Sequence, residues 1–309
     1  MRHLISMRDI GKEEILEILE EAREMENLLN TKKPLKLLEG KILATIFYEP
    51  STRTRLSFET AMKRLGGEVI TMTDLKSSSV AKGESLIDTI RVISGYADII
   101  VLRHPNEGAS RLASEYSQVP IINAGDGSNQ HPTQTLLDLY TILREIGKID
   151  GIKIAFVGDL KYGRTVHSLV YALSLFDNVE MYFVSPKELR MPKDIIDDLK
   201  SKNITFYEIE DLKDIGDDVD VLYITRIQKE RFPDPNEYEK VKGCYKIKKD
   251  YVIGKKFIIM HPLPRVDEID YDVDNLPQAK YFKQSFYGIP VRMAILKKLI
   301  DENQHDNGG

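Results

Sequence analysis

The segment YEPSTRTRLSFET, residues 48–60, concentrates side chains that bind anions. Five positions, STRTR, hold the hydroxyls of Ser51, Thr52 and Thr54 and the guanidiniums of Arg53 and Arg55. An apolar run precedes them and an amphipathic run follows, which predicts a strand-to-helix turn. The free N–H groups of a helix start, together with a planar guanidinium, favour phosphate-like oxygens. A Ser/Thr helix cap followed by solvated arginines fits the same residues, and Arg55 also fits a structural ion pair.

Further cationic and polar side chains stand at other predicted strand ends. Arg103 follows DIIVL, and the glycine-rich loop GDGSNQHPTQT carries His131 and Gln134, although a capping role for His131 is the alternative. In the second half of the chain the same position is taken by Arg164, by Arg226 and by the segment HPLPR. Ligands of open α/β sheets bind beyond the carboxyl ends of the strands. This pattern predicts a site for small, multiply anionic ligands.

The segment GDLKYGRT, residues 158–165, differs by one residue from a phosphate-binding loop of nucleotide hydrolases. That loop requires a lysine where this chain has Arg164. The nearest acidic residue, Asp159, lies inside the loop and not at a separate strand end, where it could hold magnesium. The segment also lacks Gly-x-Gly-x-x-Gly, so nucleotide hydrolysis and dinucleotide binding are both disfavoured.

Apolar runs alternate with amphipathic helical segments along the chain. KILATIFY (41–48), EVITMT, DIIVL and VPIIN are expected strands in the first half, and IKIAFVGD (152–159), VEMYFVS, VDVLYIT and KKFIIMH in the second. This alternation predicts an α/β fold of two domains, each an open parallel sheet flanked by helices, with the active site in the cleft between them. We expect domains at 1–146 and 147–300, a final helix at about 286–300 that packs back on the first domain, and a disordered tail at 301–309.

Composition excludes several classes of protein. The chain has 309 residues, a net charge of -5 and a single cysteine, Cys244. The acidic balance disfavours broad nucleic-acid binding, and one cysteine rules out an internal disulfide or a cysteine-cluster zinc site. No apolar segment has the length of a membrane span or a signal peptide. We therefore expect a cytoplasmic protein that contacts neither membranes nor nucleic acid.

Long motifs resemble the aspartate/ornithine carbamoyltransferase family over nearly the whole chain. They are STRTRLSFE, DGSNQHPTQ, VGDLKYGRTVHSL, TRIQKERF and HPLPRVDEI. The chain has HPLP where ornithine-specific relatives typically carry a cysteine, and it has the TRIQ segment that they lack, so the resemblance implies a dicarboxylate substrate. The implied reaction moves the carbamoyl group of carbamoyl phosphate to the amine of L-aspartate, an early step of pyrimidine biosynthesis. A carbamoyltransferase for another amino acid, or a non-catalytic relative that binds these ligands, is the alternative.

The resemblance also implies a role for each site residue, with no metal or organic cofactor. The catalytic residues would be Thr54, Arg103, His131 and Lys82. Carbamoyl phosphate would be bound by Ser51, Thr52, Arg53, Thr54, Arg103, His131, Gln134, Ser78 and the carbonyls of Leu263 and Pro264. L-aspartate would be bound by Lys82, Arg164, Arg226 and Gln228. In the serine run, Ser77 and Ser79 compete with Ser78 for its role.

The loop DLKSSSVAKGES, residues 74–85, carries Lys82. Its polar, serine-rich composition predicts an exposed loop, for which a solvated surface charge is the ordinary interpretation of Lys82. The resemblance instead implies that the loop completes the active site of a neighbouring chain in a homotrimer. Regulatory chains that form a larger assembly with such trimers are a further possible partner.

Overall fold

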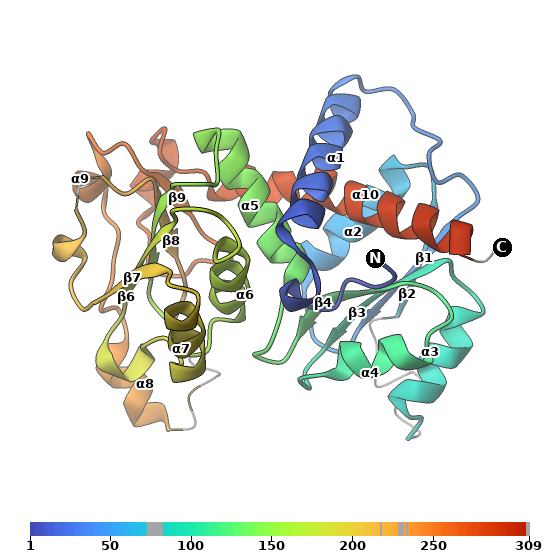
Figure 1. The fold of residues 1–309 in the computed structure, drawn as a ribbon, viewed down its shortest axis with the longest axis horizontal. Coiled ribbons are helices and arrows are strands. Elements are labelled where there is room, and N and C mark those ends of the chain that lie inside the picture. Colours follow the sequence, from blue (N-terminus) through green and yellow to red (C-terminus); the bar gives the residue numbers. More distant parts are fainter. Residues whose placement is uncertain (73–82, 217, 228–231, 233, 307–309) are drawn as a thin grey trace. The chain divides into compact units, whose positions relative to one another are not determined.

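A computed structural model describes residues 1–72, 83–216, 218–227, 232 and 234–306. The chain forms two compact units. Unit 1 holds Met1–Tyr140 and the chain from Tyr287 onward, and unit 2 holds Thr141–Phe286. Each unit contains one sheet whose strands are all parallel, with helices packed on it (Figure 1). The predicted α/β class with two parallel sheets is thereby confirmed.

The sheet of unit 1 has four strands in the order β2-β1-β3-β4. They are β1 (Ile42–Phe47), β2 (Glu68–Met72), β3 (Ile99–His104) and β4 (Ile121–Asp126). The chain leaves β1 toward β2 on one side and returns to β3 on the other, so the strand order reverses between β1 and β3. Such a reversal is where ligands bind at the carboxyl edge of an open sheet.

Helices cover both faces of this sheet (Figure 1). They are α1 (Lys12–Asn30), α2 (Thr52–Arg64), α3 (Leu86–Ser94), α4 (Ala109–Tyr116), the first part of α5 (Pro132–Ile146) and most of α10 (Tyr281–Asp306). Alternate residues of the central strands, such as Ile46 and Leu102, pack against Ile90 of α3 and Ala113 of α4. Both faces are buried, which explains why β1 reads as a nearly continuous apolar run. Every residue of β4 is buried as well, including the polar Asn123 and Asp126.

The sheet of unit 2 has five strands in the order β7-β6-β5-β8-β9. They are β5 (Lys153–Val157), β6 (Glu180–Val184), β7 (Thr205–Ile209), β8 (Val221–Ile224) and β9 (Ile258–Met260), with helices α6 (Arg164–Leu173), α7 (Lys193–Ser201), α8 (Pro235–Val241) and α9 (Lys249–Val252). The order again reverses, here between β5 and β8. Both sheets therefore place a reversal between two neighbouring central strands.

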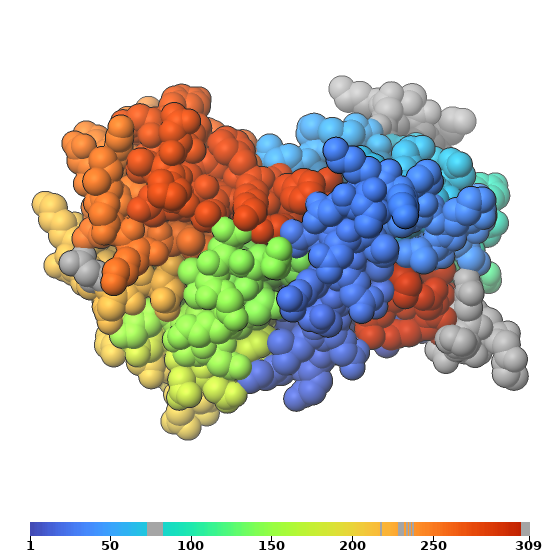
Figure 2. Space-filling view, turned by 90° about the horizontal axis from the view of Figure 1, so that it is seen from above, coloured from blue at the N-terminus to red at the C-terminus, as the bar shows by residue number. Residues whose placement is uncertain are grey.

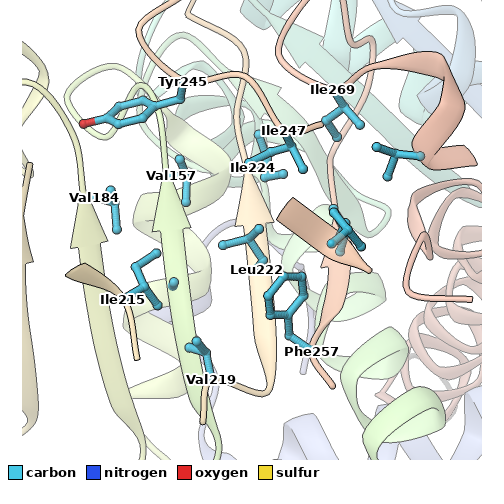
Figure 3. Close-up of a cluster of buried hydrophobic side chains, with 14 of the residues drawn as sticks. Val157, Val184, Ile215, Val219, Leu222, Ile224, Tyr245, Ile247, Phe257 and Ile269 are labelled. Carbon is cyan, nitrogen blue, oxygen red and sulfur yellow. The ribbon is translucent and has the colours of Figure 1, made fainter. Parts of the chain in front are cut away.

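A buried apolar cluster fills one face of the second sheet. Alternate strand residues, including Val157, Leu222 and Ile224, point toward Tyr245 and Phe257 from the segments that follow β8 (Figure 3). Burying side chains of this size contributes on the order of 1.5–3 kcal/mol each. The cluster gives the strand ends of unit 2 a rigid base.

The limits of the two compact units differ in two places from the expected domain limits. The chain leaves unit 1 inside α5, after Tyr140, and not in the loop after residue 146. The final helix begins at Tyr281, ahead of the expected start at about 286, and contains Pro290. Its part from Tyr287 onward belongs to unit 1.

The predicted disordered tail over 301–309 is wrong for its first six residues, which continue α10 to Asp306. Ion pairs one turn apart explain the continuation, because Lys297 contacts Asp301 at 3.2 Å and Lys298 contacts Glu302 at 2.9 Å. Lys298 also contacts Glu17 of α1 at 3.0 Å. The surfaces of these two helices lie side by side, blue against red, in Figure 2.

Candidate active site

The site residues predicted for unit 1 lie at the carboxyl ends of three neighbouring strands. Ser51–Thr54 follow β1, Arg103 is the penultimate residue of β3, and His131 and Gln134 follow β4. Register places Phe47 of β1 opposite Arg103, and β3 pairs directly with β4. The sheet therefore brings these groups to one edge, as predicted.

The start of α2 is arranged as an anion site. Ser51 is the N-cap residue in an extended conformation, and its hydroxyl makes no capping hydrogen bond to the described backbone of the helix. The first turn of α2 carries arginines and no acidic residue. Burial lowers the pKa of Arg53 below its ordinary value, because its guanidinium is a partly desolvated cation. The capping interpretation of Ser51 is weakened, and its hydroxyl is available to a ligand.

Arg55 belongs to the framework of the helix. Its Nε lies 3.9 Å from Oε1 of Glu59, one turn along α2. Glu59 in turn accepts a hydrogen bond from Thr71 of β2 at 3.0 Å. This contact confirms the interpretation of Arg55 as a structural ion-pair partner.

Arg103 is held by two neighbouring segments. Its Nη1 donates to the carbonyl of Ala124 in β4 at 3.1 Å, and its Nε lies 3.4 Å from Oε2 of Glu49 in the loop before α2. The backbone N–H of Tyr48 donates to the carbonyl of Arg103 at 2.8 Å. These contacts fix the guanidinium at the rim of the sheet.

The loop between β4 and α5 is organised by one carboxylate, Asp126. Its Oδ1 accepts from Asn123 at 2.9 Å and from the N–H of Gln130 at 3.2 Å, and its Oδ2 accepts from the N–H of Gly108 at 2.9 Å. The loop ends at His131, which is buried and whose carbonyl accepts from Gln134 N–H at 3.1 Å. A buried polar framework therefore sets the position of the histidine.

In unit 2 the segment GDLKYGRT is a close-packed turn. A Cβ on Gly158, whose φ is +115°, would lie 2.5 Å from the carbonyl oxygen of Thr225, so only glycine fits beside β8. Oδ1 of Asp159 accepts from the N–H of Tyr162 at 2.9 Å. The turn delivers Arg164 to the start of α6, where it is buried.

Arg226 follows β8 and is partly buried. Strand β8 pairs with β5, and the turn after β5 leads to Arg164 at the start of α6. Both arginines thus stand at the strand-order reversal of the second sheet. Three further predicted residues, Ser78, Lys82 and Gln228, lie outside the described residues.

The loop after β9 carries Leu263 and Pro264, joined by a cis peptide bond, with Leu263 at a φ of 56°. His261 fixes this loop: its Nδ1 accepts from the N–H of Leu263 at 2.8 Å, and its Nε2 lies 2.6 Å from Oε1 of Glu268. Because Nδ1 accepts, Nε2 carries the proton and donates to the carboxylate. Glu268 also accepts from the N–H of Val266 at 3.0 Å.

A second clamp holds the same loop through Arg265. Its guanidinium forms a two-pronged ion pair with Asp274 and lies 4.6 Å from the ring of Tyr271 and 5.2 Å from that of Tyr281. Sequence reasoning missed the supporting roles of His261, Glu268 and Arg265. A histidine and a glutamate seven residues apart, on either side of two prolines, was the available signal.

The described residues contain no cluster of three or more His, Cys, Asp or Glu side chains that could hold a metal ion. Within the same part of the chain, no helix is long and apolar enough to cross a membrane. The chemistry of both rims rests on arginine, histidine, hydroxyl and amide groups and on backbone carbonyls.

Two family models match the chain. Residues 2–144 match the carbamoyl-P binding domain of aspartate/ornithine carbamoyltransferase, and residues 150–299 match the Asp/Orn binding domain of the same family. The aspartate carbamoyltransferase catalytic subunit of Methanocaldococcus jannaschii is 90% identical over 304 residues, which cover 98% of this chain and 99% of that protein. The corresponding subunit of Methanococcus aeolicus is 67% identical over 99% of this chain and 98% of its own length.

Solved structures agree with these matches. A crystal structure of the M. jannaschii catalytic subunit gives a TM-score of 0.94 at 90% identity, covering 98% of this chain and 99% of that one. Trypanosoma cruzi aspartate transcarbamoylase in complex with carbamoyl phosphate gives a TM-score of 0.91 at 40% identity, covering 96% and 95% of the two chains. A further T. cruzi structure of that enzyme contains carbamoyl phosphate and aspartate.

Proposed function

Because the chain belongs to the aspartate/ornithine carbamoyltransferase family, we propose that it transfers the carbamoyl group of carbamoyl phosphate to the amine of L-aspartate. The products are N-carbamoyl-L-aspartate and phosphate. The observation that carries the proposal is the rim of unit 1, where a helix start, Arg103, His131 and Gln134 meet at three neighbouring strand ends. Relatives named for this reaction, at 90% and 67% identity, support aspartate as the acceptor.

Carbamoyl phosphate is assigned to unit 1. The N–H groups at the start of α2, the hydroxyls of Ser51, Thr52 and Thr54, and Arg53 hold the phosphate, with Arg103 reaching it from β3. Thr54, Arg103 and His131 surround the carbonyl oxygen. Gln134 and the carbonyls of Leu263 and Pro264 accept hydrogen bonds from the carbamoyl amino group.

The reaction needs a neutral amine and a stabilised oxyanion. The deprotonated amine of aspartate attacks the carbonyl carbon, and negative charge grows on the oxygen held by Thr54, Arg103 and His131. Preorganised donors stabilise this charge more than the ground state, and losing one such donor costs about 3 kcal/mol. The bond to phosphate then breaks, the nitrogen loses a proton, and arginines hold the departing anion.

Aspartate is assigned to Arg164, Arg226 and Gln228, with Lys82 reaching both substrates and Ser78 beside it. The guanidiniums of Arg164 and Arg226 match the two carboxylates. Much of the rate comes from holding two mutually repelling anions together in one orientation.

The proposal includes an assembly. A homotrimer in which Ser78 and Lys82 of one chain complete the site of its neighbour fits the polar loop that carries them. Regulatory chains that bind such trimers, a role in pyrimidine biosynthesis and a cytoplasmic location complete the proposal.

The test is release of phosphate from carbamoyl phosphate with and without L-aspartate. We expect release that depends on aspartate and stays at background with ornithine. Release driven by ornithine would identify a carbamoyltransferase for another amino acid. Binding of both ligands without release would identify a non-catalytic relative.

A further inference from the structure

Gln134 is the amide that faces the carbamoyl group in the proposed function, and its two ends are chemically opposite. Its Oε1 accepts hydrogen bonds and its Nε2 donates them. A carbamoyl amino group donates, so only Oε1 is a suitable partner. The direction of this amide therefore decides whether the pocket accepts or rejects the donor substrate.

The structure contains a group that fixes this direction. Nε2 of Gln134 donates to Oδ1 of Asp138 at 2.9 Å, one turn along α5. Asp138 is fully buried and Gln134 is 9% exposed. An ionised carboxylate only accepts, so it binds the Nε2 end and leaves Oε1 on the other side.

A buried cation balances Asp138. Arg292 of α10 is 3% exposed and interacts electrostatically with Asp138, and its guanidinium lies 5.0 Å from the ring of Phe58. Burial lowers the pKa of Arg292 to about 10, which still leaves it charged at neutral pH. A cation in this place favours the anionic form of the carboxylate beside it.

The backbone of α10 makes room for this cation. A Cβ at Gly288, one turn before Arg292, would lie 2.2 Å from its Nη1 and 3.3 Å from Leu137 of α5. A glycine inside a helix destabilises that helix relative to alanine. Here it is the residue that admits the guanidinium between the two helices.

We propose that Asp138, balanced by Arg292, is a positioning residue that directs Oε1 of Gln134 toward the substrate and thereby selects a donor with an N–H group beside its carbonyl. This inference rests on the proposed function. A methyl group in place of the amino group, as in acetyl phosphate, gives Oε1 nothing to accept. The buried carboxylate thus acts on donor choice without touching the substrate.

The measurement is the ratio of affinities for carbamoyl phosphate and acetyl phosphate, each by calorimetry. In Asp138→Asn the new amide can donate to Gln134 and allow its side chain to turn over, so we expect the ratio to fall at least tenfold. Affinity for acetyl phosphate should stay within threefold of wild type. Arg292→Lys, which keeps the cation beside Asp138, should leave the ratio within threefold.

A purely structural role predicts a different result. General damage to the pocket would weaken both donors together and leave the ratio unchanged, which would overturn the proposal. Combining Asp138→Asn with Gln134→Ala gives a second criterion, because two residues that act as one unit show non-additive effects. Additive losses of carbamoyl phosphate affinity would also overturn it.

Asp138→Asn leaves Arg292 as a buried charge, so this variant can fail to fold. The charge-balanced pair Asp138→Asn with Arg292→Gln is the second variant, and it should show the same lowered ratio. Wild-type protein gives an independent readout by NMR with ¹⁵N-labelled glutamine. The side-chain N–H protons of Gln134, assigned by their loss in Gln134→Ala, should exchange slowly with carbamoyl phosphate bound, and rapid exchange would refute the proposal.

The two proposals fail in different ways. Wild-type protein that binds neither donor would refute the proposed function, and this inference with it. Wild-type protein that transfers carbamoyl groups to aspartate but binds acetyl phosphate equally well would refute only the role of Asp138.

Discussion

The two units place charged groups at the same part of the same architecture but support them differently. In unit 1 the groups sit at two helix starts and a strand end, where Arg103 is bound to Ala124 and the Asp126 framework holds the loop before His131. In unit 2 Arg164 starts a helix, while Leu263 lies in a loop clamped by Glu268 and Asp274. A phosphate suits converging N–H groups, whereas separate carboxylates suit separate guanidinium forks.

The largest effect is expected for the two residues that test whether neighbouring chains of the proposed homotrimer share an active site. Lys82→Ala and His131→Ala should each lower turnover by about 1,000-fold or more, because in the proposed function each removes a group that acts on the reacting carbonyl or on both substrates. When the two inactive proteins are dissociated, mixed and reassembled, activity should return in proportion to the fraction of hybrid assemblies. Recovery confined to hybrids would show that Lys82 serves a site on another chain.

Reassembly of each variant with itself is the control and should give no activity. If verified hybrids recover nothing, Lys82 acts within its own chain, and the shared site is wrong.

The next largest effect concerns Arg53, which is proposed to bind the phosphate at the start of α2. Arg53→Ala should lower turnover by a few hundredfold and weaken carbamoyl phosphate binding, since a charge-assisted pair to phosphate is lost at a cost of roughly 2–4 kcal/mol. Calorimetry with carbamoyl phosphate measures it. Arg55→Ala is the matched control: it removes a neighbouring guanidinium that contacts Glu59 at 3.9 Å, and it should change binding less than about threefold. Equal losses in both variants would contradict a specific role for Arg53.

A substitution in unit 2 should instead affect the binding of aspartate. Arg226→Ala should raise the aspartate concentration needed for half-maximal rate by about 30-fold or more, since an unpaired carboxylate costs roughly 2–4 kcal/mol. Carbamoyl phosphate binding should be preserved. Arg190→Ala, which removes a surface pair with Glu210 at 2.7 Å in the same unit, is the control. A fall in carbamoyl phosphate affinity would undo the assignment of substrates to units.

The smallest effect concerns the support of the Leu263 loop. Burial alone raises the pKa of Glu268, but the hydrogen bond and charge of His261 and the N–H of Val266 outweigh it, so the pKa lies below its ordinary 4.5. Its contribution to stability is therefore present above about pH 4.5 and is lost as the pH falls through the lower folded-state pKa. Glu268→Gln should cost about 1–3 kcal/mol at neutral pH, measured by urea unfolding.

The difference between wild type and Glu268→Gln should shrink below pH 4.5. Glu239→Gln, an exposed residue 3.8 Å from Lys242, should cost little at either pH. A difference that does not vary with pH would show that the carboxylate charge is not what His261 requires.

The sequence predicted the strands that are buried on both faces, because β1, β5 and β8 read as nearly continuous apolar runs. It missed β7, an edge strand whose residues are exposed or only partly buried, so no apolar run marks it. The rim residues were predictable for a related reason, since ligand groups in this architecture follow strand ends. Arg103 and His131 required no more than that rule.

The groups that orient the rim were not predictable in the same way. Asp138 stands one helical turn from Gln134, which is a visible spacing, but its partner Arg292 comes from the far end of the chain. Burial and pairing over such separations are properties of the packed structure. The helical extent of α10 beyond residue 300 was missed because its polar composition concealed the ion pairs of Asp301 with Lys297 and of Glu302 with Lys298.

Gly288 constrains how the sequence can diverge. Any side chain there displaces the guanidinium of Arg292, and any neutral replacement of Arg292 leaves Asp138 without its opposing charge. Positions 138, 288 and 292 should therefore be inherited as a set. A homologue that loses the charge or the small residue at one of them should have replaced the others as well. A library that randomises them one at a time should recover almost only the parental residues, together with lysine at position 292.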